Sequence, residues 1–230
     1  MNAPRYAIYF APDQGDPVER FGTSLLGYDA ETGHEIEQTE LPNVGADALR
    51  DWTAEARRYG FHATLKAPFR LATGRSEGEL CAALDDFALR RQAFAFRLRL
   101  ASLGGFVALL PAEPSIELER LEADIVTEFE PFRAPLDEKE TARRLAAPLS
   151  ERQRELLDCY GYPYVLEEFR FHMTLTRRLA PDLREQVMAA LRAHIDRTAP
   201  NPLAEVRSLT VFRQQDADSN FRIVHRARLS

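Results

Sequence analysis

Two pentapeptides in this chain repeat the same pattern of apolar residues around a histidine and a threonine. The first is Phe-His-Ala-Thr-Leu at 61–65, and the second is Phe-His-Met-Thr-Leu at 171–175. Random placement of five histidines among 230 residues predicts about a quarter of one His-x-Thr match. The second copy, with the same flanking Phe and Leu, therefore predicts two equivalent positions in one fold.

The order of predicted elements around the two copies indicates an internal duplication. Apolar periodicity predicts motif strands over 61–70 and 168–176, each followed by a helix, over 77–91 and 181–198 respectively. A hairpin follows each helix, with strands over 94–100 and 106–111 in the first copy and over 204–213 and 221–229 in the second. A strand is also predicted over 6–11, with helices over 17–26, 46–57, 115–129 and 150–158 and an irregular loop over 27–45.

This duplication predicts how the chain is divided. We expect a single domain over 1–230, with an approximate first half over 1–111, an intervening segment over 112–165 and a second half over 166–230. Duplicated halves commonly pack around a pseudo-two-fold axis, which would bring the two motif strands to one central cleft.

Alternation of side chains along a strand gives each motif one polar and one apolar face. The polar face of the first strand carries His62, Thr64 and Lys66. The polar face of the second carries Arg170, His172, Thr174 and Thr176. The opposite faces are apolar, so we expect them to pack into the core.

The polar residue types suit phosphoester chemistry without a metal. Histidine titrates near neutrality, so one imidazole can act as general base while the other acts as general acid. Threonine hydroxyls can donate hydrogen bonds to the non-bridging phosphate oxygens, where charge builds in the transition state. The structural alternative is two buried strands whose His and Thr side chains only satisfy hydrogen bonds.

Composition limits the partners. The net charge is −6, which argues against binding of long phosphate backbones but allows a small anionic substrate in a local cationic pocket. The 30 basic residues include only two lysines, Lys66 and Lys139.

Cys81 and Cys159 do not form a disulfide framework, the N-terminus does not resemble a signal peptide, and no apolar run is long enough to span a membrane. We expect a cytoplasmic protein with a small phosphorylated substrate and no membrane partner, and the oligomeric state stays open.

The paired motifs resemble those of the 2H phosphoesterase superfamily, which includes 2′,3′-cyclic phosphodiesterases and RNA 2′-5′ ligase-like proteins. The longer strings 58–69, 161–164 and 169–176 are similar to a branch associated with bacterial phosphonate-utilisation operons. The resemblance covers almost the whole chain. It implies a bilobal α+β fold, no required metal or other cofactor, His62 and His172 as acid and base, and Thr64 and Thr174 as phosphate ligands.

Further residues are secondary candidates for substrate contacts. Lys66 and Arg170 could neutralise phosphate or simply reach solvent, Tyr59 could stack on a base or sugar or pack in the core, and Thr176 shares the motif face. For Arg133, Arg143 and Arg144 the sequence favours solvated helix charges over a specificity loop. No spacing of His, Cys or Asp suggests a metal site, and no glycine-rich phosphate loop is present.

These observations predict a metal-independent phosphoric diester hydrolase acting on a small cyclic phosphate or phosphodiester. The resemblance implies a place for it in phosphonate catabolism. Two alternatives stay open. One is RNA end processing of the 2′-5′ ligase-like type, and the other is a non-catalytic RNA-binding module.

Overall fold

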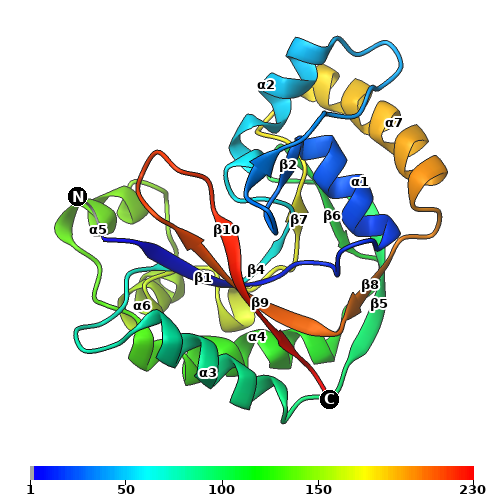
Figure 1. The fold of residues 1–230 in the computed structure, drawn as a ribbon. Helices are drawn as coiled ribbons and strands as arrows, with labels where there is room; N and C mark the ends of the chain where they lie inside the picture. Colours follow the sequence, from blue (N-terminus) through cyan, green and yellow to red (C-terminus); the bar gives the residue numbers. More distant parts are fainter. Residues whose placement is uncertain (1–2) are drawn as a thin grey trace.

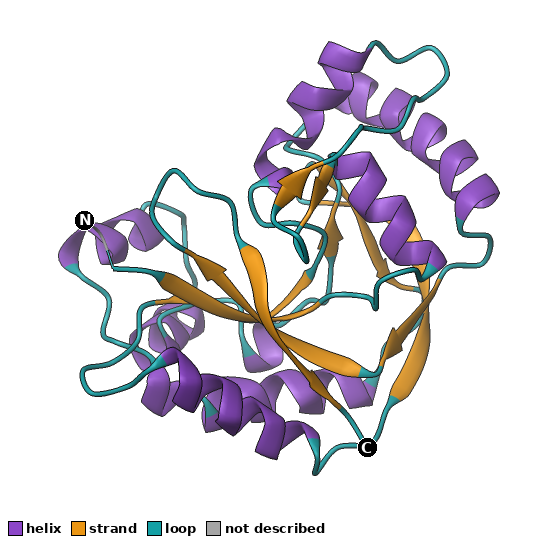
Figure 2. Ribbon diagram, in the orientation of Figure 1, coloured by secondary structure: helices purple, strands orange, loops and turns teal. Residues whose placement is uncertain are grey.

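The fold is a curled antiparallel sheet with helices gathered in two groups (Figure 1, Figure 2). The structure is a computed structural model that describes residues 3–230. One group of helices contains α1 (Pro17–Leu26), α2 (Ala46–Arg57) and α7 (Pro181–Thr198). The other contains α3 (Glu77–Ala88), α4 (Ile116–Glu128), α5 (Glu138–Leu145) and α6 (Glu151–Tyr160). The predicted α+β class is confirmed.

Eight strands form the main sheet. In chain order they are β1 (Arg5–Phe10), β4 (Ala63–Phe69), β5 (Phe94–Leu103), β6 (Phe106–Pro111), β7 (Met173–Thr174), β8 (Leu203–Val206), β9 (Ser208–Gln214) and β10 (Arg222–Arg228). The order across the sheet is β10-β9-β1-β4-β7-β6-β5-β8, and every pairing is antiparallel. A separate two-stranded sheet, β2 (Tyr28–Asp29) with β3 (His34–Glu35), occupies part of the predicted loop.

The two motif strands, β4 and β7, are neighbours at the centre of the sheet. Four strands form each side of this centre, so the sheet has the pseudo-symmetry that the duplication predicts. The hairpin β5–β6 lies on the β7 side and β9–β10 lies on the β4 side. Strand β6 therefore pairs directly with the motif strand of the other copy, β7, whereas β9 reaches β4 through β1, which lies between them.

The second motif strand and the last hairpin differ from their predicted lengths. Only Met173–Thr174 form strand β7, whereas a strand was predicted over 168–176; a 3-10 helix, Leu166–Glu168, takes up the start of the predicted range. The predicted strand over 204–213 is divided near Arg207 into β8, which pairs with β5, and β9, which pairs with β1 and β10. One segment therefore supplies strands at both ends of the curled sheet.

Helix formation follows local signals where an apolar stripe or a cap is present. The Ser76 hydroxyl accepts the backbone N–H of Glu79, whose carboxylate accepts the Ser76 N–H, so a capping box starts α3. The same helix buries Leu80, Leu84 and Phe87 against the sheet and packs on β9 and β10. Helix α7 covers β5 and β6 in the same way.

Helix α5 was not predicted, because it buries none of its residues and so lacks an apolar stripe. A capping box formed by Asp137 and Glu140 marks its start and was the one local signal for it. Among residues 3–230, no helix has both the length and the apolar character needed to cross a membrane.

We expect Gly22→Ala to destabilise the fold, because a Cβ at this position of α1 would lie 2.2 Å from the ring of Phe61, beside the first motif histidine. Overpacking of a core costs about 1–3 kcal/mol. Gly78→Ala in α3 is the matched control, since a Cβ there meets nothing within 4 Å and alanine is the better helix former. Denaturant unfolding of both variants measures the difference, and equal stability of the two would contradict the close packing.

Candidate functional site

The two motifs meet at the centre of the sheet, where Ala63 of β4 is paired with Met173 of β7. Both of these residues are fully buried, and the pattern of burial is the same in the two hexapeptides 61–66 and 171–176. Four polar side chains of the motifs are half-buried: His62, Thr64, His172 and Thr174. The structure therefore brings the four main candidate residues together at one place.

Two cavities adjoin the motifs. The larger, about 710 Å³, is lined by His62, Thr64 and Thr174, and the smaller, about 280 Å³, is lined by Thr64 and His172. Thr64 lines both cavities, so it lies at their junction. A group held at this junction would have one motif histidine on each side.

Matching hydrogen bonds fix the tautomer of both imidazoles. Nδ1 of His62 is 2.9 Å from the carbonyl oxygen of Gly60, and Nδ1 of His172 is 2.7 Å from that of Arg170. A carbonyl oxygen only accepts, so Nδ1 carries the proton and donates in each case. In the neutral ring, Nε2 is left with a free lone pair, which is the form needed for a general base. Thr64 Oγ1 lies 3.4 Å from Nε2 of His62.

Burial keeps both imidazoles neutral at pH 7. Burial is the main reason that the pKa of His62 is lowered to about 4; the hydrogen bond to Gly60 acts in the opposite direction, and the nearby His172 adds a smaller lowering effect. Burial also lowers the pKa of His172. The ring of Tyr9 stacks on His62, with 3.9 Å between centroids, and helps to exclude water from it.

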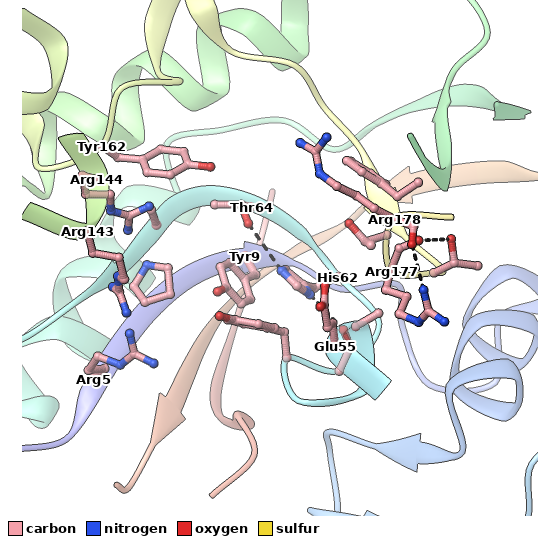
Figure 3. A pocket seen from close by; sticks show the side chains of 18 residues that line it. Arg5, Tyr9, Glu55, His62, Thr64, Arg143, Arg144, Tyr162, Arg177 and Arg178 are labelled. Atoms are coloured by element: carbon pink, nitrogen blue, oxygen red, sulfur yellow. Dashed lines mark hydrogen bonds between the residues drawn. The ribbon is translucent and has the colours of Figure 1, made fainter. Parts of the chain in front are cut away.

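The larger cavity is cationic although the chain as a whole is acidic. Five arginines and one carboxylate, Glu55, line it: the arginines are Arg5, Arg143, Arg144, Arg177 and Arg178. Figure 3 shows three of the arginines at one end, His62 and Thr64 in the middle, and Arg177 with Arg178 at the other end. This distribution favours an anionic ligand that extends along the cavity.

Lys66 does not share the face of His62 and Thr64, contrary to the prediction. The β1–β4 register shifts between Ile8, paired with Lys66, and Tyr9, paired with Thr64, so β4 has one extra residue there. A bulge of this kind reverses the alternation of side chains that follow it. Lys66 is buried away from both cavities, where its Nζ donates to the carbonyl oxygen of Val126 at 3.0 Å and pairs with Glu130 at 2.9 Å.

The other secondary candidates lie beside the cavities. Tyr59 lines the larger one and stacks on Phe221, with 5.2 Å between ring centroids, and Arg170 lines the smaller one with an exposed side chain. Thr176 lines the larger cavity, but its hydroxyl accepts the N–H of Val107 at 3.0 Å and is 2% exposed. Its hydroxyl is therefore occupied by the backbone.

Sequence reasoning missed several residues that line the larger cavity. Tyr9 and Arg5 lie on β1, which no motif marks and which reaches the site only through its pairing with β4. Arg143 and Arg144 were interpreted as solvated helix charges, but α5 places both at the cavity. The one available signal was their position in a segment without a counterpart in the other half.

No group of three or more His, Cys, Asp or Glu side chains within residues 3–230 is arranged to hold a metal ion. Burial raises the pKa of Glu122, which lines the smaller cavity, to about 8, while the N–H of Leu166 and the charge of Lys66 act in the opposite direction.

Comparison with protein families gives a match over residues 64–222 to the family described as "Protein of unknown function (DUF1045)". The chain belongs to this family. The matched range contains Thr64 and the whole second motif. Family membership thus covers most of the chain that builds the two cavities.

Two curated relatives carry the name "Ribose 1,5-bisphosphate phosphokinase PhnN". The protein from Janthinobacterium sp. (strain Marseille) is 39% identical over 216 residues, which cover 92% of this chain and 48% of the relative. The protein from Laribacter hongkongensis (strain HLHK9) is 35% identical over 219 residues, covering 95% of this chain and 50% of the relative. The chain spans about half the length of these relatives.

Among solved structures, one similar chain is E. coli LigT, crystallised in complex with 3′-AMP. It is 16% identical, with a TM-score of 0.43, and the alignment covers 100% of this chain and 99% of LigT.

We expect Thr174→Val and Thr176→Val to have different effects, because only the Thr176 hydroxyl has a backbone partner. Thr176→Val leaves the buried N–H of Val107 unsatisfied, which costs about 1–3 kcal/mol of unfolding free energy. Thr174→Val removes a cavity-lining hydroxyl and should change stability by less than about 1 kcal/mol. Thermal and denaturant unfolding of the two variants measures this, and a larger loss in Thr174→Val would refute the assignment.

Proposed function

We propose that this chain is a metal-independent phosphoesterase that hydrolyses a small cyclic phosphate or related phosphodiester with two histidines as general acid and base. The observation that carries the proposal is the juxtaposition of two His-x-Thr motifs whose imidazoles have matching Nδ1–carbonyl hydrogen bonds. Each Nε2 is thereby reserved for proton transfer. An arrangement with only structural histidines would not require the same tautomer in both copies.

In the proposed reaction, Thr64 and Thr174 donate hydrogen bonds to the non-bridging oxygens of a phosphate at the junction of the two cavities. The neutral Nε2 of one histidine removes a proton from water as its oxygen attacks phosphorus. The bond from phosphorus to the leaving oxygen breaks, and the other imidazolium protonates that oxygen. The product is a phosphomonoester with a free hydroxyl, and solvent returns both rings to their starting protonation.

The proton for the acid step is taken up by one of the histidines when the substrate binds. Both imidazoles are neutral at pH 7 in the empty site, because burial lowers the pKa of each. A bound phosphate places negative charge beside them and raises these pKa values, so one ring takes up a proton as substrate binds.

The name of the curated relatives supports a sugar phosphate as substrate, since it concerns ribose 1,5-bisphosphate. The kinase activity in that name is not proposed for this chain. The chain spans about half of their length, and a kinase of the phosphate-loop type requires a Gly-x-x-x-x-Gly-Lys-Ser/Thr sequence that these 230 residues lack.

Replacement of either motif histidine should abolish most of the activity. We expect His62→Ala and His172→Ala each to lower kcat on a panel of ribose and nucleoside cyclic phosphates by about 10²–10⁴-fold, the contribution typical of general acid–base catalysis. His34→Ala is the matched control, because His34 is exposed on β3 and lines neither cavity. The wild type should keep its rate in EDTA. Full activity of either motif variant would rule out the two-histidine mechanism.

The pH dependence of kcat/KM should be a bell with its optimum below pH 6.5. The rate should rise with pH as the general base loses its proton, and fall as the general acid loses its own. Burial places both free-enzyme pKa values below the ordinary 6.5, with His62 near 4, so both limbs are displaced to acid pH. A profile measured on one cyclic phosphate tests this, and an optimum above pH 7 would contradict it.

A further inference from the structure

Three arginines gather at one end of the larger cavity, away from His62, and Tyr162, which also lines the smaller cavity, lies beside them (Figure 3). Arg5 comes from β1, Arg143 and Arg144 from α5, and Tyr162 from the segment after α6. We call these four residues the arginine end. The proposed reaction uses none of them, since it takes place at the junction beside Thr64.

The guanidinium groups of the arginine end have no carboxylate partner. Within residues 3–230, no Asp or Glu oxygen lies within 4.0 Å of Arg5, Arg143 or Arg144. By contrast, Arg177 at the opposite end pairs with Asp51 at 2.5 Å. Unpaired like charges repel, and this repulsion is relieved when an anion binds among them.

Arg144 gives the most direct sign of a missing partner. Its Nε is buried and has no hydrogen-bond partner among the described residues. Its guanidinium lies over the ring of Tyr162, with Cζ 4.7 Å from the centroid, so the side chain is held in place. A buried donor without a partner costs free energy, and nearly all such donors in proteins are satisfied. A ligand oxygen in the cavity would satisfy this one.

Arg5 and the helix that carries Arg143 and Arg144 are also held in position. Nε and Nη2 of Arg5 both donate to Oε1 of Gln214, at 2.9 Å and 2.5 Å, which leaves the N–H groups of Nη1 available. Helix α5 is anchored by Arg70, which pairs with Asp137 at 3.2 Å and with Glu140 at 2.6 Å. The side chains of Arg5 and Arg144 and the helix that carries Arg143 are therefore arranged before any ligand binds, which lowers the entropic cost of binding.

We propose that the arginine end is a second anion site, which binds a terminal phosphate of the substrate while the scissile phosphate lies beside Thr64 and Thr174. Arginine forks fit phosphate oxygens in bidentate fashion, and a terminal phosphate has three such oxygens to share among three arginines. The substrate class is then a cyclic phosphodiester that carries a separate phosphomonoester elsewhere on the same small molecule. This inference rests on the proposed phosphoesterase function and specifies its substrate.

The test compares two probes, uridine 2′,3′-cyclic phosphate with and without a 5′-phosphate. The wild type should show a KM about 10- to 100-fold lower for the 5′-phosphorylated probe, as expected for one or two charged hydrogen bonds. Arg5→Met, Arg143→Met and Arg144→Met should each remove most of this advantage and leave the other probe unaffected. Arg152→Met is the matched control, because Arg152 lies on the surface of α6 in pairs with Glu155 and Glu167.

Two outcomes separate this inference from the proposed function. Hydrolysis of both probes with equal KM, or equal losses on both probes in the arginine variants, would overturn the second anion site and leave the phosphoesterase intact. Hydrolysis of neither probe would count against the phosphoesterase. In that case, calorimetry of probe binding tests whether the arginine end is an anion site. Tighter binding of the 5′-phosphorylated probe, lost in Arg144→Met or Arg143→Met, would support it, whereas equal or undetectable binding of both probes would overturn it.

Discussion

The antiparallel pairing of Ala63 with Met173 is the contact on which the candidate site depends. Side chains alternate along a strand, so this register places a His and a Thr from each copy beside the same pair of cavities. A slip of one residue would turn the four polar side chains into the core and the apolar flanks toward the cavities. The buried flanks, Phe61, Leu65, Phe171 and Leu175, oppose that slip because each is at most 4% exposed in the core.

The same packing sets the chemistry of the imidazoles. The flanking residues and Tyr9 remove water from His62, and this desolvation lowers its pKa to about 4. The carbonyl of Gly60 holds the Nδ1 proton, as that of Arg170 does for His172. Gly60 itself requires glycine, since its φ is +72° and a Cβ would lie 2.7 Å from Cβ of Ala30. Core packing thus sets the tautomer of both imidazoles and keeps both of them neutral.

Electrostatic focusing in the larger cavity comes from segments that are far apart in the chain. A net charge of −6 describes the whole surface, whereas the cavity collects five arginines and one glutamate from β1, α2, α5 and the end of the second motif. Helix α5 contributes through ion pairs with Arg70 and not through an apolar face. Because α5 buries none of its residues, its two arginines add positive charge to the cavity while the helix adds no buried residue to the core.

The sequence by itself determined the elements with a strong local signal: the helices with apolar stripes, the hairpins, and the two motifs with their flanking residues. Those signals are local, because periodicity and helix caps depend on residues that are close together in the sequence. Only the tertiary structure decided that each hairpin joins the other copy, that a bulge turns Lys66 into the core, and that Arg5, Arg143 and Arg144 meet at one end of a cavity. These depend on strand pairing and helix docking between segments distant in sequence, and no local pattern encodes the register or the ion pairs that position them.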